Sequence, residues 1–258
     1  MRESKDILID NFIQSPNLPS GRVRLMLMSG EYPELCEKFE NLGVGIIRTE
    51  PDLRLPYPER FHADIQCQHL GGKSIMLVSG NIMLKNKLLT LGFNVYETFN
   101  TIKEIYPGNV LLNSVRLNKR VILNKKTVDN NLLDFYKNTN VELINVRQGY
   151  TRCSTAVING HSIITSDPSI YKEAKKSGLD VLKIRPGFIN LPGYNYGFIG
   201  GACTLIDKNI IAFTGDINTH PDCELIYNFI NERNIEIINL TSGTLIDVGG
   251  MIQLKEYN

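Results

Sequence analysis

Two short motifs carry side chains that could perform nucleophilic chemistry. Cys153 follows Arg152, and a neighbouring cation favours the thiolate, the reactive form of cysteine. His62 and Asp64 lie two residues apart, so on a strand they would share one face. A carboxylate beside an imidazole can fix its tautomer, which suits a general acid or base. These residues predict a Cys153 nucleophile with His62 and Asp64 as its catalytic partners.

Each candidate also has a structural interpretation. Cys153 could be a buried strand cysteine, since free cysteine packs like a small apolar residue. His62 could be a loop histidine with one hydrogen bond. Cys203 is the second candidate nucleophile, because Gly200-Gly201 before it would let a ligand approach the backbone. The same structural alternative applies to Cys203.

A second polar group surrounds Pro221. Asp216 could bind a cationic ligand, and His220 and Asp222 lie near it in the sequence. The alternative is that this group caps the helix that begins at Pro221. Nothing in the spacing selects a metal, so we expect neither a metal site nor a cofactor.

Two loops interrupt the regular pattern, at 185–197 and 55–58. Long loops within a compact domain are typically lids or binding loops. Asn195 and Tyr196 in the longer loop are therefore candidates for substrate binding. We expect both loops to border the same opening.

The elements that must position these residues recur five times. A helix-like segment ends at Gly or Asn, and a short apolar strand follows. Only glycine and, less easily, asparagine adopt the left-handed conformation that closes a helix. These markers are Gly43, Gly92, Asn140, Gly178 and Asn234. Their spacing indicates one supersecondary motif with loops of variable length.

A hairpin precedes the helix before each of the last four markers. Its turns are expected at 71–73, 118–119, 159–160 and 207–208, and Asn-Gly at 159–160 is a strong hairpin signal. The helices are expected at 81–90, 128–137, 168–176 and 221–233. The repeating unit is therefore β-β-α-β.

The first unit has one strand too few, with a strand at 24–28 and a helix at 33–41. The end of the chain supplies two further strands, at 244–248 and 251–254, with no helix after them. Pairing them with the first unit would close a ring and remove unpaired edges. We therefore predict one α/β domain, a closed ring of five units. The N-terminal extension is expected at 1–21, and the blades near 22–50 with 243–256, 58–98, 108–147, 149–185 and 196–240.

The topology gathers polar residues at one mouth of this ring. The first strand of each unit runs away from that mouth, and the second returns after the turn. Residues just before a first strand or just after a second strand therefore meet there. His62, Cys153 and His220 fall at this mouth, whereas His161 follows a turn at the far mouth.

Such a ring resembles the pentein, or α/β-propeller, fold of the guanidino-group-modifying enzymes. The resemblance covers the chain from about Arg22 and rests on the architecture and on motifs at 62–64, 149–153, 194–201 and 215–222. It indicates a branch distinct from the named enzymes. The resemblance implies a cysteine nucleophile, a histidine acid/base and carboxylates that hold a guanidinium at one mouth of the channel.

One departure concerns the nucleophile. In agmatine-deiminase-like relatives, a His-Cys dipeptide follows a glycine pair in the last hairpin, whereas Gln253 and Leu254 stand here after Gly249-Gly250. The usual C-terminal catalytic cysteine is therefore missing. Either the activity has been lost or a cysteine of another blade has replaced it.

Two functions remain open. The chain could be a Cys-dependent hydrolase or transferase acting on a small guanidino, amidine or amide compound. It could also be an inactive pentein that binds a small molecule or a protein, as non-catalytic penteins of ribosome assembly do. For the first function, the candidate substrate-binding residues are Arg152, Asn195, Tyr196, Cys203, Asp216, His220 and Asp247.

Composition excludes several classes. The 258 residues are 42% hydrophobic and carry a net charge of +1, which gives no electrostatic footprint for nucleic acid or an anionic membrane. Five cysteines without a close pair argue against a disulfide framework and a zinc knuckle. The first six residues include acidic side chains and resemble no secretory signal, so we expect a cytoplasmic protein. The expected partner is a small-molecule ligand. The oligomeric state stays open.

Overall fold

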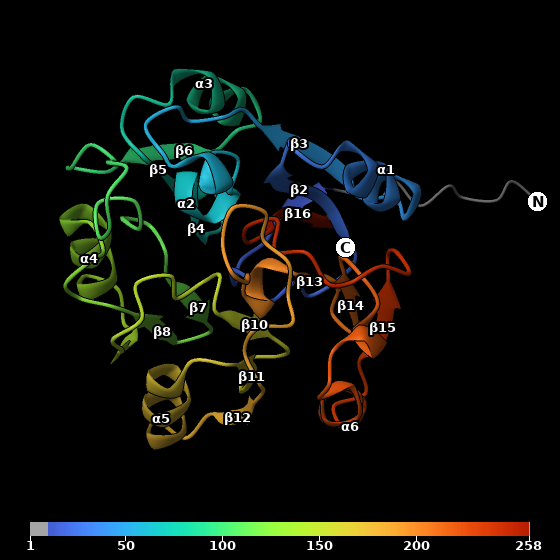
Figure 1. Ribbon diagram of the computed structural model, residues 1–258. Coiled ribbons are helices and arrows are strands. Elements are labelled where there is room, and N and C mark those ends of the chain that lie inside the picture. The colour runs from blue at the N-terminus through green and yellow to red at the C-terminus, as the bar shows by residue number, and fades with distance from the viewer. Residues whose placement is uncertain (1–9, 258) are drawn as a thin grey trace, which may run out of the picture.

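Five small sheets surround a common centre in the computed structural model, which describes residues 10–257 (Figure 1). In each sheet, an antiparallel strand pair adjoins a parallel pair. One long helix of each unit lies on the outside of the ring (Figure 1). The predicted α/β ring of five β-β-α-β units is therefore confirmed. The first nine residues of the expected N-terminal extension lie outside the described range.

Four units contain three strands and one long helix each. They are β4 (Cys67–Gly71), β5 (Ser74–Leu77), α3 (Ile82–Thr90) and β6 (Asn94–Glu97); β7 (Val115–Leu117), β8 (Arg120–Leu123), α4 (Asn130–Lys137) and β9 (Glu142–Asn145); β10 (Thr155–Val157), β11 (Ser162–Thr165), α5 (Pro168–Lys176) and β12 (Asp180–Lys183); and β13 (Cys203–Asp207), β14 (Ile210–Phe213), α6 (Cys223–Asn231) and β15 (Glu236–Asn239). The predicted hairpin turns join the first two strands of all four units.

Helices α3, α4 and α5 begin where a side chain accepts free backbone N–H groups of the first turn, whereas α1 (Pro33–Asn41) and α6 have no such side-chain cap. The Asp167 carboxylate accepts hydrogen bonds from the N–H groups of Ser169 and Ile170, and Pro168 occupies the first turn of α5. The Asn81 side chain accepts from the N–H of Leu84 in α3. Local sequence therefore fixes where these helices start.

Four of the five helix-end markers adopt the left-handed conformation. Gly43, Gly92, Gly178 and Asn234 have φ of 81°, 90°, 77° and 55°. Asn140 is not among the residues with positive φ, so that part of the prediction is wrong. Helix α4 ends at Lys137, as expected, and the Thr139 hydroxyl donates a hydrogen bond to the carbonyl of Tyr136 in the turn that follows.

One C-terminal strand, and not two, completes the first unit. Its sheet has the order β1 (Asp10–Phe12), β16 (Ile252–Tyr257), β2 (Val23–Ser29) and β3 (Gly45–Thr49), and its helix is α1 (Pro33–Asn41). Residues 244–248 form only an isolated bridge between Asn190 and Ile246. The backbone there bonds to loops and not to a sheet: the Thr214 hydroxyl donates to the Ile246 carbonyl.

Buried apolar clusters join each unit to its neighbours. Five clusters are present in the described chain, and each contains side chains of two adjacent units. The cluster that closes the ring combines Met26 of β2 with Ala212 of β14. Burial of one large apolar side chain contributes about 1.5–3 kcal/mol, so these contacts hold the ring shut.

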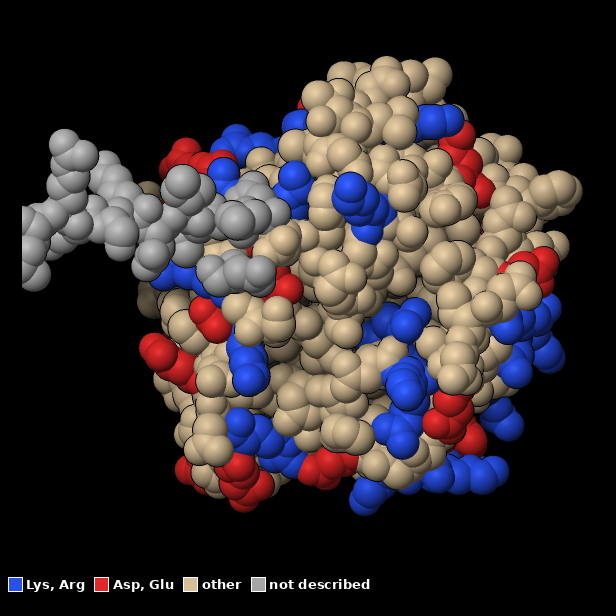
Figure 2. Space-filling view, turned by 180° about the vertical axis from the view of Figure 1, so that it is seen from behind, with Lys and Arg blue, Asp and Glu red and all other residues tan. Residues whose placement is uncertain are grey.

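The surface carries both signs of charge. Seen from behind, basic and acidic side chains are interspersed around the rim, with broad areas of other residues between them (Figure 2). This pattern agrees with the net charge of +1. Among the described helices, none is long and apolar enough to cross a membrane.

Candidate functional site

The first strands of the units lie nearest the centre of the ring. Strand β10 contacts β13, and β16 contacts β4, although each pair belongs to different sheets. The residues that directly precede these strands therefore meet at one end of the ring. That end is the mouth at which the sequence places His62 and Cys153.

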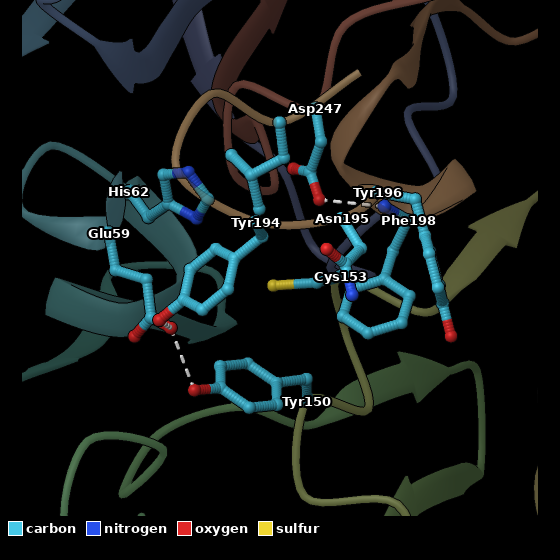
Figure 3. A pocket seen from close by; sticks show the side chains of 10 residues that line it. Glu59, His62, Tyr150, Cys153, Tyr194, Asn195, Tyr196, Phe198 and Asp247 are labelled. Carbon is cyan, nitrogen blue, oxygen red and sulfur yellow. Dashed lines mark hydrogen bonds between the residues drawn. The ribbon is translucent and has the colours of Figure 1, made fainter. Parts of the chain in front are cut away.

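A pocket of about 260 Å³ opens among these residues (Figure 3). Its size suits a small ligand, because one water molecule takes about 30 Å³ in the liquid. Aromatic rings and carboxylates dominate its wall. The lining residues are Glu59, His62, Tyr150, Cys153, Leu191, Tyr194, Asn195, Tyr196, Phe198 and Asp247.

His62, Asp64 and Cys153 converge at the inner end of the pocket. A ring nitrogen, a carboxylate oxygen and the sulfur lie within 4.8 Å of one another. The Cys153 thiol donates a hydrogen bond to Asp64 Oδ2 at 2.8 Å. The amide nitrogen of Asn113 donates to the same oxygen at 3.2 Å and lies 3.4 Å from the sulfur. The three side chains offer the donor atoms of a metal site as well as the parts of a nucleophilic one.

The reason that His62 and Asp64 lie together differs from the one predicted. They are not on a strand: His62 precedes the single turn α2 (Ala63–Gln66), and Asp64 lies within it. The Gln66 amide holds this turn by donating to the carbonyls of Glu50 and Arg60. Cys153 likewise lies in a turn before β10 rather than within the strand.

The surroundings of Cys153 favour the thiol and not the thiolate. Burial, followed by the charges of Asp64 and Asp247, raises its pKa well above the usual value. The sequence suggested the opposite because Arg152 is adjacent in the chain. The direction differs because the Arg152 guanidinium points elsewhere.

Arg152 connects the inner ends of several units. Its guanidinium donates hydrogen bonds to Asn17 Oδ1 at 3.1 Å and to the carbonyls of Gly200 and Met251 at 3.0 and 3.1 Å. The side chain is 4% exposed and is not among the pocket-lining residues. The structure therefore supports a positioning role for Arg152 more than contact with a substrate.

Asp247 is a buried carboxylate held by backbone N–H groups. It accepts hydrogen bonds from the N–H groups of Phe198 and Gly249 at 2.8 and 2.9 Å. Burial raises its pKa. A Cβ atom at Gly201 would lie 1.7 Å from its Oδ1, so glycine is required there for close approach.

Glu59 ends the short helix η1 (Tyr57–Glu59) and forms a second anionic group in the pocket. Its carboxylate accepts hydrogen bonds from the hydroxyls of Tyr150 and Tyr194, both at 2.8 Å, and from the Asn109 amide at 2.7 Å. Tyr194 belongs to the loop at 185–197 and Glu59 directly follows the loop at 55–58. The two loops therefore meet over the same opening.

Three other candidate residues lie away from the pocket lining. The Cys203 sulfur faces the Ile199 carbonyl at 3.3 Å within a buried apolar cluster, and burial raises its pKa to about 12. Asp216 caps the short helix η3 (Ile217–Thr219). The His220 ring accepts a hydrogen bond from the N–H of Asp222 at 3.0 Å. Asp216 therefore has a capping role, but at η3 and not at the helix after Pro221, α6 (Cys223–Asn231), which has no side-chain cap.

Asn195, Tyr196 and Asp247 do line the pocket, together with residues that the sequence analysis did not select. Glu59 and Tyr150 belong to this second group, and Asn113 supports the pocket from behind. Asn113 lies two residues before the first strand of its unit, as Cys153 does, so the same topology places it at this mouth. The side chains of Gln253 and Leu254 lie inside the ring, where Gln253 donates to Thr204 Oγ1 at 2.7 Å.

The fold is shared with solved enzyme structures. A C. jejuni agmatine deiminase has a TM-score of 0.54 and 11% identity, with 93% of each chain covered. An inosamine-phosphate amidinotransferase from Streptomyces griseus has a TM-score of 0.60 and 7% identity, covering 94% of this chain and 97% of that one. DDAH from Pseudomonas aeruginosa, as a variant with citrulline, has a TM-score of 0.57 and 6% identity, covering 92% and 100%. At these identities, the likeness shows the pentein fold alone.

Sequence comparison adds one assignment. No curated protein matches the sequence. The model described as "Family of unknown function (DUF6873)" matches residues 27–252. This match spans most of the ring, from β2 to the start of β16. The chain therefore belongs to the DUF6873 family.

Proposed function

We propose that this protein is a cysteine-dependent hydrolase or transferase that acts on a C–N bond of a small guanidino or amidine compound. The observation that carries this proposal is the convergence of Cys153, His62 and Asp64 on one pocket. The enzymes with similar structures include an agmatine deiminase and an amidinotransferase, which is consistent with such a substrate.

The charges of the pocket favour a cationic ligand. Glu59 and Asp247 line it and Asp64 lies at its inner end, whereas no lysine or arginine of residues 10–257 lines it. Tyrosine rings such as Tyr150 can add cation–π attraction to a guanidinium. A planar cation could therefore be held by carboxylates at its edge and by aromatic rings at its face.

A bound cation would also activate the thiol. The guanidinium would compete with the Cys153 S–H for Asp64 and place a positive charge next to the sulfur. Opposite charge at a few ångströms favours the ionised form of a group. The substrate itself would thus supply the cation that Arg152 does not supply.

The reaction follows from these positions. The thiol proton passes to His62 as Cys153 Sγ forms a bond to the guanidino carbon. His62 then protonates the departing nitrogen, the C–N bond breaks, and a thiouronium remains on the sulfur. Attack by water, with His62 accepting its proton, breaks the C–S bond and yields a ureido product. If an amine attacks in place of water, the C–S bond breaks and the amidino group passes to that amine; the enzyme is then a transferase.

The raised pKa of Cys153 supports a second candidate function, a module that binds a small cation without chemistry. In that case, the thiol would act as a hydrogen-bond donor to Asp64. This alternative differs from the enzyme in one measurable property, the reactivity of Cys153 when a cation is near it.

Two alkylating reagents of equal shape separate these functions. 2-Chloroacetamidine carries a positive charge and 2-chloroacetamide is neutral. For the enzyme, we expect the cation to label Cys153 at least about tenfold faster, which is 1.4 kcal/mol, and to lose this advantage in His62→Ala and Asp64→Asn. The half-buried Cys223 is the internal control and should react similarly with both. Equal and slow labelling of Cys153 by both reagents would exclude the enzyme and leave the binding module.

A further inference from the structure

The cluster at the inner end of the pocket has two unusual features. Nitrogen, oxygen and sulfur donors from His62, Asp64 and Cys153 lie within 4.8 Å of one another, on residues that are 2%, 0% and 2% exposed. Two polar atoms of these side chains, His62 Nε2 and Asp64 Oδ1, are buried without a hydrogen-bond partner among residues 10–257. Buried polar atoms without partners are costly, so their presence in one cluster indicates that a ligand satisfies them.

We propose that His62, Asp64 and Cys153 bind one Zn²⁺ ion. Zinc takes imidazole nitrogen, carboxylate oxygen and thiolate sulfur at about 2.0–2.3 Å, and three protein ligands leave one position open. Here the open position would face the pocket. Mg²⁺ and Ca²⁺ prefer oxygen ligands throughout, so a site with a thiolate and an imidazole disfavours them.

The residues behind the cluster hold the three ligands in place. Asn113 donates to Asp64 and accepts from the backbone N–H groups of Arg152 and Cys153 at 2.6 and 3.4 Å. A Cβ atom at Gly249 would lie 2.6 Å from His62, and one at Gly250 would lie 2.7 Å from Asp64 Oδ2. Such supporting contacts fix the geometry of the ligands, and their loss typically lowers metal affinity by roughly 10- to 100-fold.

The charges of the proposed ligands also match a divalent cation. Zinc binding forms a Zn–S bond and releases the thiol proton to solvent, so the ion meets a thiolate and the Asp64 carboxylate. These two anions neutralise the two positive charges of the metal. Asp247 lies close enough to raise the pKa of Cys153, and it adds a further carboxylate on the pocket side.

Zinc and a cationic substrate would compete for the same side-chain atoms. The Zn–S bond would draw electron density from Cys153 Sγ, and the ion would take the place of the substrate cation beside Asp64, so the metal would inhibit the proposed reaction. The zinc site itself does not rest on that reaction. An active enzyme without a zinc site, or a zinc site without activity, would each be recognised separately.

The test is metal binding by the full chain, measured without any substrate. The metal-free protein is titrated with Zn²⁺ and, as a spectroscopic probe, with Co²⁺. We expect one ion per chain and a near-ultraviolet thiolate-to-cobalt charge-transfer band. Cys153→Ser and His62→Ala should each weaken binding by more than about 100-fold, beyond the cost of losing a supporting contact, and Asn113→Ala by about 10- to 100-fold.

A matched control removes the same residue types elsewhere. The double variant Cys223→Ser, His161→Ala loses a half-buried cysteine and an exposed histidine outside the cluster, and should bind the ion unchanged. Circular dichroism verifies that each variant is folded. In the wild type, Zn²⁺ should protect Cys153 but not Cys223 from iodoacetamide, which tests the site even if a variant fails to fold. Absence of the cobalt band, its persistence in Cys153→Ser, or failure of protection would overturn the proposal.

Discussion

At the residue scale, the charge state of Cys153 depends on partners from distant parts of the chain. Asp64 and Asp247 belong to other units, and together with burial they raise the pKa of the thiol. Adjacent sequence gave a misleading indication, since Arg152 directs its guanidinium to backbone carbonyls. The meeting of His62 and Cys153 at one mouth could therefore be predicted from topology, whereas the protonation of Cys153 could not, because it depends on side-chain directions.

The ion pair of Arg185 and Asp222 gives a pH-dependent prediction. A 2.6 Å contact with Arg185 lowers the pKa of Asp222 below its usual value. A carboxylate with a depressed folded-state pKa stabilises the protein above its unfolded pKa, about 3.9, and this contribution is lost as the pH falls through the folded value. Asp222→Asn should therefore lower the melting temperature at pH 7, with the difference from wild type shrinking below about pH 4.

Melting temperatures measured between pH 7 and pH 3 test this. Asp134→Asn is the control, because Asp134 pairs with Lys137 on the exposed face of α4. Exposed pairs contribute about 0–1 kcal/mol, so it should show little change at either pH. A deficit in Asp222→Asn that stays constant down to pH 3 would show that the lost contribution is not the ionised carboxylate.

At the element scale, the sequence predicted what local rules determine. Helix α5 begins directly after the capping residue Asp167. Four helices are followed by a Gly or Asn in the left-handed conformation. The segment 244–248 was mistaken for a strand because its apolar side chains, such as Leu245, are buried in the clusters; its backbone bonds to loops, and the Ile246 carbonyl accepts from the Thr214 hydroxyl. The turn α2 was missed for a similar reason: the Gln66 side chain, and not local propensity, holds it.

Three glycine-to-alanine variants separate backbone strain from crowding in the pocket. Gly178 closes α5 with φ of 77° and open space around it, so Gly178→Ala should cost about 1–2 kcal/mol and leave the pocket intact. Gly201→Ala would place a methyl group 1.7 Å from Asp247 and should displace that carboxylate. Gly243→Ala meets only Thr241 Oγ1, at 3.8 Å, and should be close to neutral.

Urea denaturation measures the stability of these variants, and 2-chloroacetamidine labelling of Cys153 reports on the pocket. Labelling should be unchanged in Gly178→Ala and Gly243→Ala and altered in Gly201→Ala. If Gly201→Ala labelled like the wild type, Asp247 would have no influence on the thiol, contrary to the electrostatics described above.

At the scale of the whole molecule, five clusters connect five units without a free end. An open array of repeats can lose its terminal units first, because each terminal unit has one neighbour. Here β16 brings the end of the chain to the first unit, where Leu254 is fully buried in the cluster shared by the first two units. The ring should therefore unfold as one cooperative unit.

Cysteine labelling in increasing denaturant tests this cooperativity. Cys36 of α1 reports on the unit that closes the ring, and Cys203 of β13 reports on the fifth unit; both are buried and lie outside the pocket lining. Both thiols should become reactive at the same denaturant midpoint. Leu254→Ala should lower the free energy of unfolding by about 2–5 kcal/mol, because it removes a buried side chain from a shared cluster, and should shift both midpoints to lower denaturant by the same amount. If Cys36 became reactive at much lower denaturant than Cys203, the first unit would open alone, and the C-terminal strand would not stabilise the closed ring.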